Sequence, residues 1–205
     1  MSSLDEYRVV FFVVVGILTL LVASPALSRL LVMPRTEFFT ELWLLGLDHK
    51  AEGYPYNITR SQNYSVFLGI GNRLGYCAYY LVEVKFRNYT QPAPTSFGPI
   101  GNRTPSGLPS LYNITAFVAD EGVWELPLAF SFDYGYNRTL SKVGFRSLML
   151  NGVVLDLGGC ESVWDSTRSE FYGSLFFEAW IYNRTIGGFE YHGRFVSLRF
   201  NMTVV

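Results

Sequence analysis

The chain has 205 residues, a net charge of −1 and only 16% charged residues, so it offers no basic surface of the kind that binds nucleic acid. Aromatic residues make up 17% of the chain, a composition that favours β-structure over helices. The length is enough for one domain with a substantial core.

The N-terminal region begins with a short charged segment and continues with twenty uncharged residues, Val9 to Ser28. At about 1.5 Å per residue, a helix of this length spans about 30 Å, the thickness of a bilayer core. We therefore expect residues 1–8 to be a cytoplasmic stub and residues 9–33 an uncleaved transmembrane helix. The alternative is a signal peptide cut after Ala26, because small residues occupy the two positions that such a cleavage needs.

Asparagine occurs ten times, and eight of these residues begin an N-x-S/T sequon without proline at x. Since Ser and Thr together account for 29 of the 205 residues, chance would place one of them two positions after only one or two of the ten. N-glycosylation is confined to the outer face of the membrane or its equivalent. Residues 36–205 should therefore be extracellular, on a single-pass protein of the cell membrane. The predicted N-glycosylation sites are Asn57, Asn63, Asn88, Asn102, Asn113, Asn137, Asn183 and Asn201.

After the helix, apolar and aromatic residues alternate in short runs that predict strands. In chain order these are residues 38–47, 64–72, 76–86, 111–119, 128–134, 140–150, 174–182 and 193–204. Asn151-Gly152 is the clearest hairpin signal, of type I′. Loops are expected over 48–62, over the proline-rich segment 91–109, and over 158–170, which could instead be a short helix.

This pattern predicts an all-β fold, an antiparallel β-sandwich of eight or nine strands, with a closed barrel as the alternative. The run Gly69-x-Gly71-x-x-x-Gly75 is similar to a dinucleotide-binding motif, but a strand follows it where a helix would be needed. We interpret these glycines as a close strand contact and a turn. The two cysteines, Cys77 and Cys160, are expected to form a disulfide in an oxidising compartment.

Several short motifs resemble, in the same order, the archaeal membrane-protein family known as domain of unknown function 1616. The matching segments are Phe39 to Glu41, Tyr54 to Asn57, Asn63 to Val66, Gly69 to Asn72 and Trp124 to Pro127. The resemblance covers residues 38–150 and does not extend to the segment from Gly158 onward. It implies an archaeal cell surface, an immunoglobulin-like sandwich and a membrane anchor, and it implies no activity.

Candidate catalytic residues are few, and we predict that the protein is not an enzyme, with no catalytic, cofactor-binding or metal site. His49 and His192 are the only histidines, too few for a three-histidine metal site. Cys160 with His192 would be a nucleophile and base only if the disulfide is absent. The acidic residues Glu161, Asp165, Glu170 and Glu178 show no spacing that favours one face, and surface charge is the simpler interpretation.

Aromatic residues gather in the final hairpin, where alternation can bury only one set. They are Phe171, Tyr172, Phe176, Phe177, Trp180, Tyr182, Phe189 and Tyr191. We expect this aromatic-rich C-terminal hairpin to mediate self-assembly or to bind a protein partner, with the membrane as a further partner.

The favoured function is that of a non-catalytic, glycosylated surface protein, an accessory or structural subunit of a membrane or cell-envelope assembly. The alternatives are a secreted filament subunit completed by a strand from its neighbour, and a carbohydrate-active surface enzyme. The filament alternative requires cleavage near Ala26, so that the chain from Leu27 onward becomes the donated strand.

Overall fold

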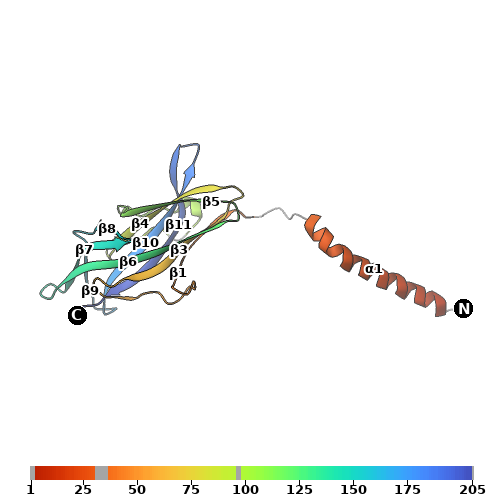
Figure 1. Cartoon of the computed structure of the whole chain (residues 1–205), viewed down its shortest axis with the longest axis horizontal. Helices are drawn as coiled ribbons and strands as arrows, with labels where there is room; N and C mark the ends of the chain where they lie inside the picture. Colours follow the sequence, from red (N-terminus) through yellow and green to blue (C-terminus); the bar gives the residue numbers. More distant parts are fainter. Residues whose placement is uncertain (1–2, 31–36, 96–97, 205) are drawn as a thin grey trace. The chain divides into compact units, whose positions relative to one another are not determined.

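The computed structural model describes residues 3–30, 37–95 and 98–204. Its helix α1 spans Ser3–Leu30, and a separate compact unit spans Phe38–Val205 (Figure 1). The strands are β1 (Phe39–Leu45), β2 (Asn57–Ile58), β3 (Tyr64–Arg73), β4 (Ala78–Arg87), β5 (Tyr112–Val118), β6 (Val123–Asn137), β7 (Lys142–Leu150), β8 (Val153–Asp156), β9 (Glu161–Asp165), β10 (Glu170–Asn183) and β11 (Gly188–Met202). One 3₁₀ turn, Ile100–Asn102, interrupts the proline-rich segment.

The expected membrane anchor over residues 9–33 is not supported. A transmembrane helix needs about 20 consecutive, mainly apolar residues. Across the described parts of the chain, no helix combines the length and the apolar character that crossing a bilayer requires. The predicted single-pass topology and cell-membrane localisation were therefore wrong, and the last three residues of that range, 31–33, lie outside the described residues.

The strands form two layers, which confirms the all-β prediction. In one layer the order is β1-β3-β6-β7, with β8 and β9 both paired to β7. In the other layer the order is β5-β4-β10-β11-β2. All of these pairings are antiparallel except the short contact of β2 with β11, and a two-residue pairing of β9 with β10 joins the layers.

The core lies between the layers and is built from alternate residues of the strands. Phe86 and Phe200 from one layer meet Phe132 and Phe145 from the other, with ring centroids 4.6 to 6.4 Å apart. All four side chains are buried. Such interdigitated aromatic packing is what holds the layers face to face.

Most predicted strands are present, and the two clear differences are short strands. Asn57–Ile58 forms β2 inside the segment expected to be a loop, and Glu161–Asp165 forms β9 where a loop or short helix was expected. Asn151 and Gly152 both have positive φ angles, +47° and +82°, so the type I′ hairpin between β7 and β8 is confirmed.

The predicted Cys77–Cys160 disulfide is wrong, because both cysteines are free thiols. Cys77 precedes the first residue of β4, whereas Asn88 follows the last and donates a hydrogen bond from Nδ2 to the carbonyl of Glu161, next to Cys160. A ten-residue strand is about 33 Å long at roughly 3.3 Å per residue. A disulfide needs Cα atoms within about 7 Å, so the length of β4 keeps the two thiols apart.

Candidate functional site

Glycines in β3 and just after it allow side chains from β1 and Phe38 to lie close against the β3 backbone. A Cβ on Gly69 would lie 2.2 Å from Trp43 Cε2, and a Cβ on Gly71 would lie 2.3 Å from Glu41 Oε2. Gly75 has a positive φ of +82°, and a Cβ there would lie 2.9 Å from Phe38. The glycine run therefore serves close strand contact and a turn, as the sequence indicated.

A cleft of about 610 Å³ lies beside β1, where the two layers end. It is lined by Phe39, Thr40, Glu41, Leu42, Trp43, Arg103, Arg194 and Phe195. Among the described residues, β1 is the last strand of its layer and pairs only with β3, and β11 pairs beyond β10 only through its C-terminal end. The cleft thus has an unpaired strand edge on each side and two arginines at its rim.

A chain of polar side chains closes the inner end of this cleft. Thr40 Oγ1 lies 2.7 Å from His192 Nε2 and 2.8 Å from the Tyr80 hydroxyl, which donates to Asn72 Oδ1 at 3.3 Å. Burial lowers the pKa of His192, and the charge of Arg194 lowers it further. A histidine in this position joins β1 to β11 through Thr40.

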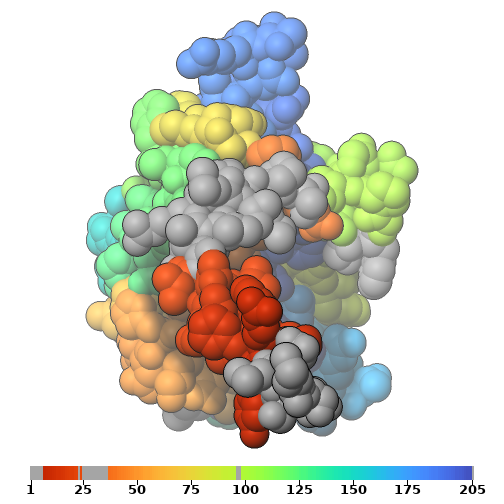
Figure 2. All heavy atoms as spheres, turned by 90° about the vertical axis from the view of Figure 1, so that its right-hand side faces the viewer, coloured from red at the N-terminus to blue at the C-terminus, as the bar shows by residue number. Residues whose placement is uncertain are grey.

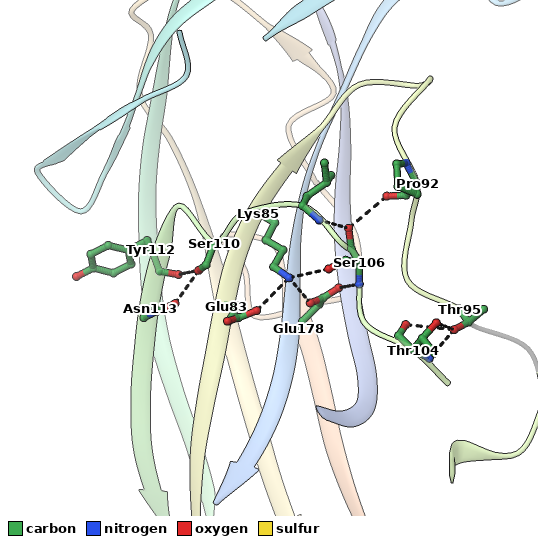
Figure 3. A network of polar contacts seen from close by, with 11 residues as sticks. Glu83, Lys85, Pro92, Thr95, Thr104, Ser106, Ser110, Tyr112, Asn113 and Glu178 are labelled. Carbon is green, nitrogen blue, oxygen red and sulfur yellow. Dashed lines mark hydrogen bonds and ion pairs between the residues drawn. The ribbon is translucent and has the colours of Figure 1, made fainter. Parts of the chain in front are cut away.

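A buried ionic cluster lies on the outer face of β4 and β10 (Figure 3). Lys85 Nζ lies 2.7 Å from Glu178 Oε2 and 3.0 Å from Glu83 Oε2, and it donates to the Ser106 carbonyl at 3.2 Å. The Ser106 amide donates to Glu178 Oε1 at 2.7 Å. The proline-rich segment, which contains Ser106, is thereby fastened over the sheet.

Most of the aromatic residues in the final hairpin are buried or half-buried, and Phe171 and Phe177 belong to the core between the layers. Phe171, Tyr172, Phe176 and Phe177 are buried, and Trp180 and Tyr191 are half-buried. Phe176 pairs across the sheet with Lys85 and is 1% exposed, so this chain shields it without a second protein. The aromatic side chains that are left for a partner to cover therefore lie at the end of the hairpin.

The end of the hairpin projects beyond the neighbouring strands, as Figures 1 and 2 show. Tyr79 stacks on Phe117 with centroids 4.1 Å apart, and Phe189 lies against Tyr79 and Tyr182. Phe117 is 73% exposed. An adjoining hollow of about 810 Å³ is lined by Tyr76, Cys77, Ala78, Tyr79, Phe117, Ile181, Tyr182, Asn183, Arg184 and Glu190.

The eight sequon asparagines are all exposed or half-buried, and none is in the core. Asn113 lies on the edge strand β5, and Asn57 and Asn201 face each other in the β2–β11 pair. Two sequon asparagines are the last residues of strands, Asn137 in β6 and Asn183 in β10. The other three lie outside the strands: Asn63 just before β3, Asn88 just after β4, and Asn102 in the 3₁₀ turn. No sequon lies on β1, β7 or β8.

The four candidate carboxylates do not converge. Glu161 pairs with Lys142, and Asp165 accepts hydrogen bonds from the Thr167 and Arg168 amides. Buried Glu170 bonds to Arg199 and Tyr56, and Glu178 bonds to Lys85. Sequence reasoning treated Glu170 and Glu178 as surface charges, but both are buried, and the partners that they bind lie far away in the chain.

The histidines and cysteines do not come together either. His49 stacks on Phe67 and contacts Glu125, His192 bonds to Thr40, and Cys160 lies at the β9 end of the molecule. Within the described residues there is no group of three or more side chains that could hold a metal ion.

Comparison with known proteins adds little beyond the fold. No protein-family model and no curated protein match this chain. A β-glucosidase from Listeria innocua in complex with glucose is 9% identical over 82% of this chain, with a TM-score of 0.36. The match covers only 17% of that enzyme. The ASH/PapD-like domain of human CEP192 is 9% identical over 85% of this chain and 93% of its own length, with a TM-score of 0.30. Similarities this distant carry no argument about this chain. Its own strand pairings make it a mostly antiparallel, two-layer β-sandwich preceded by one helix.

Proposed function

We propose that this protein is a non-catalytic, N-glycosylated structural or accessory subunit of an archaeal cell-envelope assembly, built on an immunoglobulin-like sandwich. The excess of sequons supports glycosylation, as does the position of every acceptor asparagine outside the core. The separate partners of each candidate catalytic side chain support a role without catalysis. The resemblance to domain of unknown function 1616 supports the archaeal origin.

The observation that carries the proposal is the placement of the sequons relative to the strand edges. An exposed edge strand can pair with another chain, and proteins cover or interrupt such edges. Here β5 carries Asn113, β2 carries Asn57, and β8 has only four residues. β1 has seven residues, an unpaired edge, no proline or lysine, and no sequon. Glycans would leave the edge of β1 open beside the unpaired part of β11, and we assign β1 as the subunit contact.

A filament subunit completed by a donated strand is the second candidate, and the cleft beside β1 favours it. An extended segment in this cleft could bond to β1 on one side and to β11 on the other, which is how added strands are recognised. This candidate requires cleavage near Ala26, so that Leu27 becomes the start of the donated segment.

The test is to isolate the protein from cells that make it and to determine its N-terminus, glycopeptides and assembly size. We expect several occupied sequons and a particle larger than one chain. A start at Leu27 with filaments in electron micrographs selects the second candidate. An unglycosylated monomer contradicts both.

An introduced glycan then tests the contact surface. Glu41→Asn with Trp43→Thr creates a sequon on β1, and Phe117→Asn with Ala119→Thr creates a matched one on β5 that leaves the native Asn113 sequon intact. We expect the β1 glycan to abolish assembly and the β5 glycan to preserve it. Trp43→Thr alone controls for the lost indole. Assembly that survives full glycosylation of the introduced β1 sequon would exclude β1 as the contact.

A further inference from the structure

The Lys85 cluster differs from an ordinary ion pair in its burial and in its composition. The side chain of Lys85 is 4% exposed and that of Glu178 is fully buried, while Glu83 is 21% exposed. Glu83 lies directly opposite Glu178 across β4 and β10, and Lys85 is on the same face two residues along. One amine is therefore held between two carboxylates beneath a covering loop (Figure 3).

The exposed pair of Lys142 and Glu161 provides the comparison. Its Nζ–Oε2 distance is 2.8 Å, close to the 2.7 Å between Lys85 and Glu178. The Lys142 and Glu161 side chains are 35% and 53% exposed. This ion pair contains one carboxylate, whereas Lys85 contacts two. Distance alone therefore does not separate the two pairs, whereas burial and the additional carboxylate do.

We propose that Lys85 and Glu178 become joined by an amide bond in the folded protein. Lys85 Nζ forms a bond to Glu178 Cδ, one Cδ–O bond breaks, and a water molecule leaves. An ammonium and a carboxylate are converted into an amide and water, so atoms and charge balance and nothing is oxidised or reduced.

The neighbouring groups suit this step. Burial lowers the pKa of Lys85, but its hydrogen bonds to Glu178 and Glu83 outweigh burial and the pKa is raised overall. The amine must therefore give up a proton before it can attack, and the Glu83 carboxylate 3.0 Å away can accept that proton and pass it to the leaving oxygen. The Ser106 amide, 2.7 Å from Glu178 Oε1, stabilises the charge that develops on this oxygen.

The surroundings also favour the product. Two charged side chains buried away from water carry a large desolvation cost, and a neutral amide removes it. The charge that remains is on Glu83, the most exposed member of the cluster. The bond would tie β4 to β10 covalently and close the chain between residues 85 and 178, which restricts the unfolded state as a disulfide does. The proposal depends neither on glycosylation nor on assembly.

Peptide mapping by mass spectrometry of the denatured, deglycosylated full-length protein tests the proposal. We expect one cross-linked product that contains residues 85 and 178 and is lighter by one water than the sum of its two peptides. Lys142 and Glu161 should be recovered unlinked from the same digest. Complete recovery of unlinked Lys85 and Glu178 peptides from folded wild-type protein would overturn the proposal, and so would an equal yield of linked Lys142 and Glu161.

Two variants separate the reaction from a structural ion pair. Lys85→Arg keeps the positive charge without the nucleophilic amine and should give no cross-link. Glu83→Gln leaves the Lys85–Glu178 pair in place and should reduce the linked fraction at least tenfold while circular dichroism remains unchanged. A Glu83→Gln protein that is linked as fully as the wild type would overturn the assignment of Glu83 as the proton carrier. If Lys85→Arg does not fold, the wild-type digest still decides the question.

Discussion

Thr40 Oγ1 lies 2.7 Å from His192 Nε2, so β1 of one layer is joined to β11 of the other at the edge of the sandwich. Because the same hydroxyl is 2.8 Å from that of Tyr80, a single threonine connects three strands. This contact is made by a half-buried imidazole, and its strength should depend on whether that imidazole is charged.

Stability should fall as the pH drops below about 6.5, the ordinary pKa of histidine. Burial, aided by Arg194, lowers the pKa of His192 in the folded protein, while Glu190 opposes the shift. The unfolded chain therefore binds a proton at a higher pH than the folded one, so stability is full above 6.5 and declines below it. Urea unfolding at pH 8, 6.5 and 5 measures this decline.

His192→Gln should flatten the pH dependence in this window, because it removes the group whose pKa is lowered on folding. Carboxylates also titrate near pH 5, so the difference between wild type and His192→Gln is the relevant quantity. Parallel curves for these two proteins would contradict a role for His192.

Gly69→Ala should destabilise the fold by about 1 to 3 kcal/mol, because the added methyl group would overlap the Trp43 indole. Gly144→Ala in β7 is the matched control, since a Cβ there meets nothing within 4 Å. Its expected effect is within about 1 kcal/mol and can be stabilising. Chemical denaturation of both variants gives the comparison. Equal losses would show that the contact between β1 and β3 is not tight.

The parts of the fold that could be predicted are those specified by residues close together in the sequence. Alternation over Val196, Leu198, Phe200 and Met202 is a local signal, and these four side chains lie in the core or pack against it. Asn151-Gly152 likewise specified its turn without help from the rest of the chain. β2 has only two residues and exists because β11 lies beside it, so nothing within residues 48–62 could reveal it.

The polar clusters were harder to predict than the strands. Lys85 and Glu178 are 93 positions apart and become partners only when β4 and β10 pair. Each looks like an ordinary surface charge in its own segment. The cysteine prediction failed for the related reason that pairing was inferred from compartment and count, whereas the distance between the thiols is set by the direction of β4.

Phe132→Ala should cost about 3 to 5 kcal/mol, because this fully buried ring packs on Phe86, Phe145 and Phe200 and its loss would leave a cavity between the layers. Phe117→Ala removes the same number of atoms from a ring that is 73% exposed and should change stability far less. Thermal and urea unfolding of the two variants provide the test. A comparable loss for both would mean that the core is not centred on these four rings.

Both cysteines should react with a thiol reagent in protein that has not been reduced, at two thiols per denatured chain. In the folded protein Cys77, which is exposed, should react first. Cys160 should react more slowly, because it is partly buried and because burial, together with the charge of Asp156, raises the pKa of its thiol and keeps it protonated. Cys160→Ser should remove only the slow phase and Cys77→Ser only the fast one. A wild-type chain that shows no reactive thiol until it is reduced would restore the disulfide and contradict the separation of the two residues along β4.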